Sequence, residues 1–330
     1  METVVENGKV RPRERGGGAG VYALYRKELS DHIKSKRFLI IIALIAITAI
    51  ASLYAALGGL PAVLEEAVSD SVFLKLFTTG SGSIPSFVSF IALLGPLVGL
   101  TLGFDAINGE RSRGTMGRLV SQPIYRDSII NGKFLAGLTV IFIMVASLGL
   151  IISGVGLIAT GVAPSGEDVA RILVFLLFTG VYMAFWLGLS ILFSVLCKHA
   201  ATSALAVIAI WLVMAIFISL LAGIIADGLH PLTDTSPASA QLENYMTEIG
   251  VSRISPTNLY SESVSTILDP GIRAIGIVTQ EQISGAIVGN LPLSESLLLV
   301  WPHLTVLAAM TMVSFVVSYI CFMRQEIRAS

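Results

Sequence analysis

Charged residues are scarce in this sequence. Asp, Glu, Lys and Arg make up 13% of its 330 residues, while hydrophobic residues reach 54% and the mean hydropathy is +0.83. A soluble domain averages about 25% charged residues. The low charge therefore excludes an ordinary soluble protein and predicts a membrane protein.

Cysteine is almost absent, with Cys197 and Cys321 as the two in the chain. Both fall at ends of apolar runs, so we expect no structural disulfide. No Asn-x-Ser/Thr sequon occurs, which favours a prokaryotic source.

Charge is missing altogether from six long apolar runs. A membrane-spanning helix needs roughly 20 apolar residues, because it rises about 1.5 Å per residue across about 30 Å of hydrocarbon. The alternation typical of barrel strands is absent. The sequence therefore predicts an all-α polytopic membrane protein with six transmembrane helices, at Phe38–Leu57, Ser86–Phe104, Phe134–Thr160, Ile172–Leu196, Ala200–Ala226 and Ser296–Met323.

The runs also lack the residues that carry protons or perform catalysis. Charged groups inside a membrane mark ion pathways, so a proton-coupled carrier is disfavoured, whereas a sodium site made of carbonyl groups stays open. The motifs His-Glu-x-x-His and Gly-x-Ser-x-Gly do not occur. We expect no catalytic residue, metal or cofactor in this chain and no nucleic-acid partner. The histidines, which show no ligand-like spacing, are His32, His199, His230 and His303.

Lysine and arginine are distributed unevenly between the two sides of such a bundle. Nine lie before the first run, five between the second and third runs, one at Lys198 and two at the C-terminal end, against four in the alternate loops. Because Lys and Arg accumulate in cytosolic loops, we expect both termini in the cytosol and the protein in the cell membrane.

The N-terminal segment divides into two parts. Residues 1–20, with the stretch RPRERGGGAG, predict a disordered cytosolic tail before a six-span transmembrane domain at 21–330. From Val21 to Arg37, apolar residues recur at helical spacing among basic ones, which predicts a helix lying along the membrane surface. The alternative is a solvated extension of the first transmembrane helix. The apolar face comprises Val21, Leu24, Tyr25, Leu29 and Ile33.

Small residues four apart mark the second run. Gly95, Gly99 and Gly103 share one helix face, and such a face lets two helix backbones approach closely. We expect a helix–helix contact there, with a role between subunits as one alternative and an ordinary membrane helix as the other. Pro96 predicts a kink in the same helix.

Residues 227–295 form a long outer loop in this topology. Ser236–Pro237 and Ser255–Pro256 predict two helix starts, with Ser as N-cap and Pro at the first helical position. We expect short amphipathic helices over the outer mouth rather than a separate outer domain. The expected buried faces are Leu242, Met246 and Ile249 in the first helix and Tyr260, Val264, Ile267 and Leu268 in the second.

A charge-rich stretch, GFDAINGERSRGTMGRLVSQPIYRDSIINGKF, occupies residues 103–134 between the second and third runs. Within it, Met116, Leu119 and Val120 form one apolar edge among charged residues, and Pro123 ends the helical pattern. A short amphipathic helix of this kind can bury its apolar edge in a partner's groove. The simpler explanation is a loop of positive-inside residues between two helix ends.

These pieces resemble the type-2 permease family of ATP-binding-cassette exporters. The matching stretches are YRKELSDHIKSKRFLI before the first run and the 103–134 stretch, where the family shows Glu, Gly-Thr, Ser-x-Pro, Arg and Gly-Lys. SPTNLYSESVSTILDP in the outer loop is similar to the subgroup that includes permeases for nitrous-oxide-reductase maturation. The motif positions in this chain are Glu110, Gly114, Thr115, Leu119, Pro123, Arg126 and Lys133.

The resemblance implies an elbow helix at about Val21–Arg37, six spans and a cytosolic coupling helix near Arg113–Ser121. In this family the coupling helix docks on a separate ATPase subunit, which binds ATP and Mg, and two permeases pair with two ATPases. Met116 and Gly117 depart from the more usual Leu and larger residue of the family. The implied ATPase-docking residues are Glu110, Arg113, Gly114, Thr115, Met116, Leu119, Val120, Pro123 and Arg126.

We therefore expect the membrane subunit of an ATP-driven exporter, embedded in the lipid bilayer as a homodimer of permeases bound to ATPase subunits. Two other classes of membrane protein remain as alternatives. One is an ATP-independent carrier or assembly scaffold, and the other is an intramembrane enzyme whose catalytic residues converge from distant parts of the sequence. No residue pattern selects the cargo.

Overall fold

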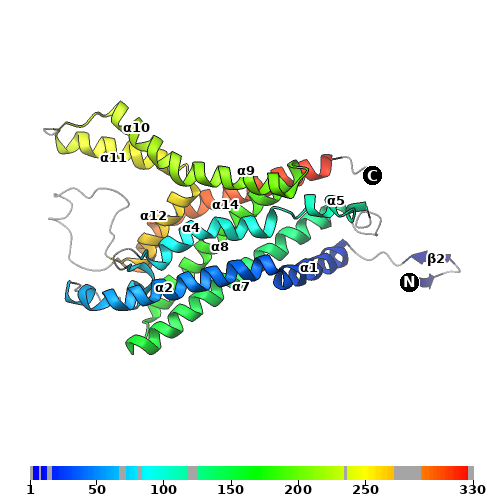
Figure 1. Ribbon diagram of the computed structural model, residues 1–330, viewed down its shortest axis with the longest axis horizontal. Helices are drawn as coiled ribbons and strands as arrows, with labels where there is room; N and C mark the ends of the chain where they lie inside the picture. The colour runs from blue at the N-terminus through cyan, green and yellow to red at the C-terminus, as the bar shows by residue number, and fades with distance from the viewer. Residues whose placement is uncertain are drawn as a thin grey trace.

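The computed structural model describes residues 3–6, 9–12, 17–66, 72–80, 84–117, 125–233, 236–270 and 291–325. Most of these residues lie in helices, and the longest helices run side by side along the molecule (Figure 1). The helices are α1 (Gly17–Lys34), α2 (Lys36–Glu66), α3 (Val72–Thr78), α4 (Phe87–Gly103), α5 (Asn108–Ser112), α7 (Arg126–Thr160), α8 (Gly166–Leu196), α9 (Ala200–Leu212), the π-helical segment η1 (Val213–Phe217), α10 (Ile218–Leu229), α11 (Ala238–Ser252), α12 (Pro256–Leu268) and α14 (Leu293–Arg324).

Six helices are long and apolar enough to cross a membrane: α2, α4 with its extension, α7, α8, the continuous α9–η1–α10 and α14. The prediction of six transmembrane helices is confirmed, and the chain is a multi-pass membrane protein. Helix ends differ from the ends of the apolar runs, because charge interrupts a run without ending a helix. Thus α7 begins at Arg126, well before the predicted start at Phe134.

The bundle has two distinct ends. α1, α5 and the last turn of α14 lie at one end, which we name the terminal end (Figure 1). α12 lies toward the opposite end, which we name the α12 end.

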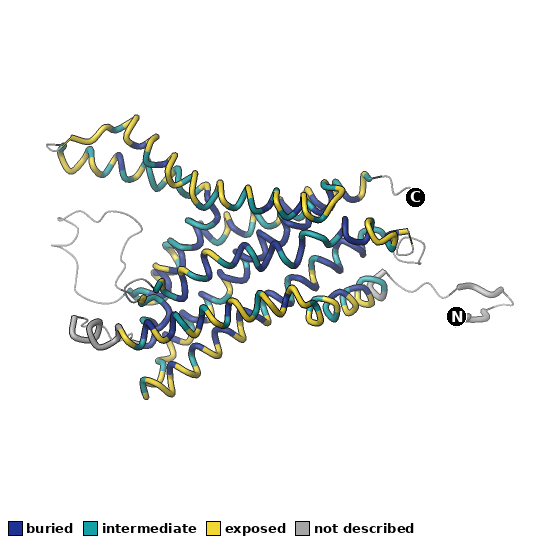
Figure 2. The backbone as a smooth tube through the Cα atoms, in the orientation of Figure 1, coloured by how far each residue is buried: buried dark blue, intermediate teal, exposed yellow. Residues whose placement is uncertain are grey.

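α8 lies at the centre of the bundle. It packs against α4, α7, α12 and α14, and Figure 2 shows much of the burial in the middle of the bundle. Its Tyr182 and Trp186 side chains are fully buried. Tyr182 donates a hydrogen bond to the main-chain oxygen of Ala92 in α4, at 2.8 Å.

α4 lies very close to α8 because glycine lines the contact. A Cβ atom on Gly99 would lie 2.6 Å from the backbone nitrogen of Leu187, and one on Gly103 would lie 2.8 Å from Cβ of Ser190. Gly95 faces the ring of Tyr182 in the same contact. The three glycines singled out in the sequence therefore lie against α8 of their own chain.

The fifth span, α9–η1–α10, lies on the outside of the bundle. Its buried residues are Ser203, Val207, Ala222 and Ala226. Large apolar side chains such as Leu205 and Ile224 are exposed. Such a face suits hydrocarbon, in which apolar side chains lose nothing by exposure.

Two short strands lie near the N-terminus. Strand β1 (Thr3–Glu6) pairs antiparallel with β2 (Lys9–Pro12), with Val5 opposite Val10. The sequence between the strands is Asn-Gly, the dipeptide most favoured in two-residue hairpin turns. Residues 17–20, also assigned to the tail, form the first turn of α1.

α1 occupies most of the segment predicted to be a helix, and it ends before Ser35. One residue of the predicted apolar face packs on α7, and a charged residue is buried beside it. Leu24 lies against Gly132 of α7, and Glu28 is buried one turn later, whereas Ile33 is exposed. α1 therefore presents a mixed face of Leu and Glu to α7.

The two short helices expected between the fifth and sixth spans are both present as α11 and α12. α12 starts at Pro256 with Ser255 as N-cap, and its predicted face is buried at Tyr260, Val264, Ile267 and Leu268, as expected.

α11 was predicted less well. Its N-cap is Pro237 rather than Ser236, and Met246 is exposed while Asn244 is buried. The reason is that Asn244 donates to Asp227 Oδ1 at 3.0 Å and to the main-chain oxygen of His230 at 2.9 Å. These bonds turn the polar face of α11 toward α10.

Candidate functional site

α5 lies at the terminal end between two groups of helices. α4 ends at Gly103, and the chain turns through Phe104–Ile107 before α5 begins. The hydroxyl of Ser194 on α8 accepts the backbone N–H groups of Ile107, at 2.9 Å, and Asn108, at 3.2 Å. Gly114 follows α5 with a positive φ of 67°, a conformation that favours glycine. The Ser194 bonds therefore attach the start of α5 to α8.

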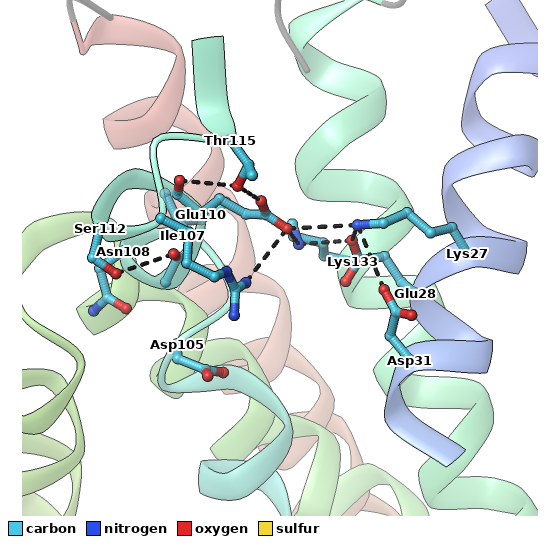
Figure 3. Close-up of polar contacts among 12 residues, drawn as sticks. Lys27, Glu28, Asp31, Asp105, Ile107, Asn108, Glu110, Ser112, Thr115 and Lys133 are labelled. Carbon is cyan, nitrogen blue, oxygen red and sulfur yellow. Dashed lines mark hydrogen bonds and ion pairs between the residues drawn. The ribbon is translucent and has the colours of Figure 1, made fainter. Parts of the chain in front are cut away.

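Buried ionic groups join α5 to α1 and α7 (Figure 3). The ammonium nitrogen of Lys133 on α7 lies 2.8 Å from Oε1 of Glu28 on α1 and 3.7 Å from Oε1 of Glu110 on α5. Lys27 adds a second ammonium group, 3.2 Å from Glu28 and 3.5 Å from Glu110. Two buried carboxylates thus share two ammonium groups, which satisfies the requirement that buried charges be paired.

Glu110 also organises the chain that follows it. Thr115 donates its hydroxyl hydrogen to the main-chain oxygen of Glu110, at 3.1 Å, and also contacts the carboxylate. Arg113 lies 3.7 Å from the same carboxylate but is largely exposed. Glu110 therefore fixes the turn after α5 from inside.

The Lys27 ammonium and the Glu28 carboxylate of α1 are charged at neutral pH. Burial raises the pKa of the Glu28 carboxyl, but the ammonium groups of Lys133 and Lys27 lower this pKa more, so it lies below its usual range. Burial lowers the pKa of Lys27, but the carboxylates of Glu28 and Glu110 raise this pKa more, so it lies above its usual range. Burial lowers the pKa of His32, which favours a neutral imidazole.

A polar cavity of about 540 Å³ lies between α1, the start of α2, the end of α4 and α5. Arg37 crosses one side of it, 2.6 Å from Asp105 and over the ring of Phe104. Asp31, Lys36 and Lys133 also line it. With charges of both signs on its walls, the cavity suits water and polar groups rather than an apolar cargo.

The opposite side of α5 contacts the ends of α8 and α14. Arg111 donates to the side-chain oxygen of Gln325, directly after α14. The amide nitrogen of Gln325 donates to the main-chain oxygen of Val195 in α8 at 2.8 Å. Arg126, at the start of α7, donates to the main-chain oxygen of Gln325 at 3.4 Å.

The predicted docking residues fall into three groups. Glu110 and Met116 are buried and face inward. Arg113 and Gly114 are exposed, and Thr115 and Arg126 are half-buried. The remaining three, Leu119, Val120 and Pro123, lie outside the described residues, as does the predicted coupling helix beyond residue 117.

A second cluster of charged groups lies toward the α12 end. Arg171 of α8 is fully buried and donates to the main-chain oxygen of Ile267 at the end of α12, at 2.7 Å. Glu262 of α12 pairs with Arg253 at 2.7 Å and with His303 of α14 at 2.9 Å. Burial raises the pKa of Glu262, but bonds from His303 and Arg253 lower it to about 2. This cluster fastens α12 to α8 and α14.

Within the described ranges, no group of three or more His, Cys, Asp or Glu side chains is arranged to hold a metal ion. At both ends of the bundle, the polar side chains form ion pairs and hydrogen bonds with one another. These contacts join neighbouring helices.

Comparison with known proteins agrees with this architecture. Residues 22–327 match the model of the ABC-2 family of transporter proteins. The chain belongs to the ABC-2 transporter family. It is 33% identical over 143 residues to "Probable ABC transporter permease protein NosY" of Stutzerimonas stutzeri, covering 43% of this chain and 48% of the relative.

A second relative carries the same name in Pseudomonas aeruginosa. It is 33% identical over 115 residues, covering 35% of this chain and 38% of the relative. The chain thus matches less than half the length of each of these curated relatives. Membership of the ABC-2 family rests on the match across nearly the whole chain.

Proposed function

We propose that this chain is the permease subunit of an ATP-driven exporter, and that α5 and the residues after it dock on a separate ATPase subunit. The observation that carries the proposal is the position of α5: α1, α7, α8 and Gln325, which directly follows α14, all contact it at the terminal end. Family membership supports the same function. A segment held in this way passes a displacement to much of the bundle, because packed helices move as rigid elements.

In this proposal the two sides of the docking segment have different roles. Of the predicted docking residues that the structure describes, Arg113 and Gly114 are exposed and can touch a partner. Glu110 and Met116 point inward, so they hold the segment in place. We therefore revise the role of Glu110 from a docking residue to a positioning residue.

ATP acts through the partner in this proposal. ATP binding draws two ATPases together, each carries the α5 segment of one permease, and the central pathway of the permease dimer opens outward. ATP can shift such an equilibrium only by favouring one of its two arrangements. The terminal end faces the cytosol, in keeping with its Lys and Arg residues.

Co-purification of the chain with its ATPase tests the docking role. Arg113→Glu reverses an exposed charge on the docking segment, and Lys198→Glu reverses an exposed charge elsewhere at the same end. We expect the first variant to lose about tenfold in ATPase binding and the second to bind as wild type does. Equal binding by both variants would count against docking at α5. A wild-type chain that binds no ATPase would favour an ATP-independent carrier or scaffold.

Cysteine labelling tests the orientation. In a background with Cys197 and Cys321 replaced by alanine, we expect Ser112→Cys to react from the cytosolic side and Ile158→Cys, at the far end of α7, from the outside. The reverse pattern would place α5 outside the cell, where a cytosolic ATPase cannot bind it.

A further inference from the structure

Gln325 connects three elements through one side chain. Its amide oxygen accepts a hydrogen bond from the Arg111 guanidinium on α5, and its amide nitrogen donates to the main-chain oxygen of Val195. Val195 lies in the last turn of α8, where carbonyl groups have no partner within the helix. Gln325 itself follows the last residue of α14. An amide suits this position because it accepts and donates at once.

The two helices that Gln325 holds extend along the whole bundle. α8 has 31 residues and α14 has 32, so each is about 45 Å long at about 1.5 Å per residue. They pack more extensively on each other than any other pair of described elements. A displacement at one end of such a helix pair is therefore transmitted to its other end.

α12 is attached to the far part of the same pair. Arg171 of α8 donates to the main-chain oxygen of Ile267, and His303 of α14 lies 2.9 Å from Glu262. Tyr260 of α12 is fully buried and stacks on Tyr182 of α8, with ring centroids 4.4 Å apart. α5 and α12 thus contact opposite parts of one helix pair.

We propose that Gln325 is a positioning residue that fastens α5 to the α8–α14 pair, so that displacement of α5 moves this pair and α12 with it. The inference rests on the proposed function, in which the ATPase supplies the displacement. The bond from Arg111 has a charged donor, which makes it one of the stronger hydrogen bonds of the terminal end. Ser194 holds the start of α5 to α8 in parallel, so loss of Gln325 weakens the connection without detaching α5.

The experiment measures a distance at the α12 end in the complex of the permease with its ATPase. Spin labels are placed at Ser265 on α12 and Ile158 on α7, both exposed, with the two native cysteines replaced by alanine. Distances are recorded with and without a non-hydrolysable ATP analogue. For Gln325→Met we expect the analogue-dependent change to fall by about twofold or more, with ATPase binding and turnover unchanged.

Three variants make the result decisive. Gln325→Glu keeps an acceptor for Arg111 but loses the donor to the Val195 oxygen, so we expect it to recover only part of the distance change. Arg111→Gln removes the other partner and should reproduce the defect, which also covers the case in which Gln325→Met does not assemble. Gln241→Met, the same substitution on exposed α11, should leave the distance change intact.

A full distance change in Gln325→Met or in Arg111→Gln overturns the inference, and so does a Gln325→Glu variant as defective as Gln325→Met. A wild-type complex that binds ATPase but shows no analogue-dependent change, or a chain that binds no ATPase, instead contradicts the proposed function.

Discussion

The ammonium nitrogen of Lys133 lies 2.8 Å from a carboxylate oxygen of Glu28, and the two side chains are only 4% and 9% exposed. This pair joins α7 to α1, and Glu110 of α5 shares the same ammonium group. A buried charge that loses its partner keeps the full cost of its desolvation. Among the residues of the terminal end, substitution of Lys133 should therefore lower the free energy of unfolding most.

Lys133→Met is expected to lower the free energy of unfolding by about 3–5 kcal/mol, because it leaves two buried carboxylates with Lys27 as their nearest ammonium group. Chemical unfolding in detergent measures the change. Arg113→Met is the matched control: its guanidinium is exposed and 3.7 Å from Glu110, so we expect a loss below about 1 kcal/mol. Equal losses in the two variants would show that the Lys133 contacts are no stronger than surface ion pairs.

Gly99→Ala is expected to separate α4 from α8. The added Cβ would meet the Leu187 nitrogen at 2.6 Å and the Met183 oxygen at 2.7 Å, and backbone atoms cannot rotate away. Overpacking of this kind costs about 1–3 kcal/mol, measured as a lower free energy of unfolding. Gly154→Ala in α7 is the control, since nothing lies within 4 Å of its Cβ and alanine favours a helix. A neutral Gly99→Ala would mean that the two helices are farther apart than the structure places them.

Acid should loosen α12 through Glu262. Its pKa is about 2 in the folded protein against 4.5 ordinarily, because hydrogen bonds from His303 and Arg253 outweigh burial. For a carboxyl whose pKa falls on folding, the stabilisation is fully present above the unfolded value and is lost as the pH falls toward the folded one. Hydrogen exchange of residues 256–268, corrected for intrinsic rates, should therefore stay constant above about pH 5 and increase as the pH falls toward 2.

Two variants check this assignment. Glu262→Gln should remove most of the acid dependence of α12, and Glu248→Gln, on α11, should leave it unchanged. Acid dependence that survives in Glu262→Gln would assign the effect to other carboxyl groups.

The six spans could be predicted from the sequence because lipid imposes one simple rule, an uninterrupted apolar run. The buried face of α12 followed from helical periodicity, since Tyr260, Val264 and Ile267 are apolar and all point into the bundle. The same reasoning failed for α11, where the buried residue is Asn244 and its partners are Asp227 and His230. Periodicity of apolar residues carries no information about a polar contact between two helices.

The candidate site could be predicted only in part. The motif contained Glu110, Thr115 and Lys133, which the structure brings together, although Glu110 faces inward. Glu28 and Gln325 were missed because their partners are distant in sequence: Glu28 lies 105 residues from Lys133, and Gln325 lies 214 residues from Arg111. A charged residue on the apolar face of α1, one turn after Leu24, was the available signal for Glu28.

Arg171 was counted in the sequence only as one of four basic residues on the outer side, yet its guanidinium holds the end of α12. Arg171→Met removes donors from the main-chain oxygens of Ile267 and Leu291, and each buried acceptor left without a donor costs about 1–3 kcal/mol. We expect faster hydrogen exchange in residues 256–268, with residues 126–160 unchanged. Lys75→Met is the control: its ion pair with Asp269 is partly exposed, so its loss should change exchange little. If Arg171→Met leaves α12 as protected as in wild type, other contacts, such as the stacking of Tyr260 on Tyr182, are enough to hold this helix, and the coupling of α12 to α8 does not depend on the arginine.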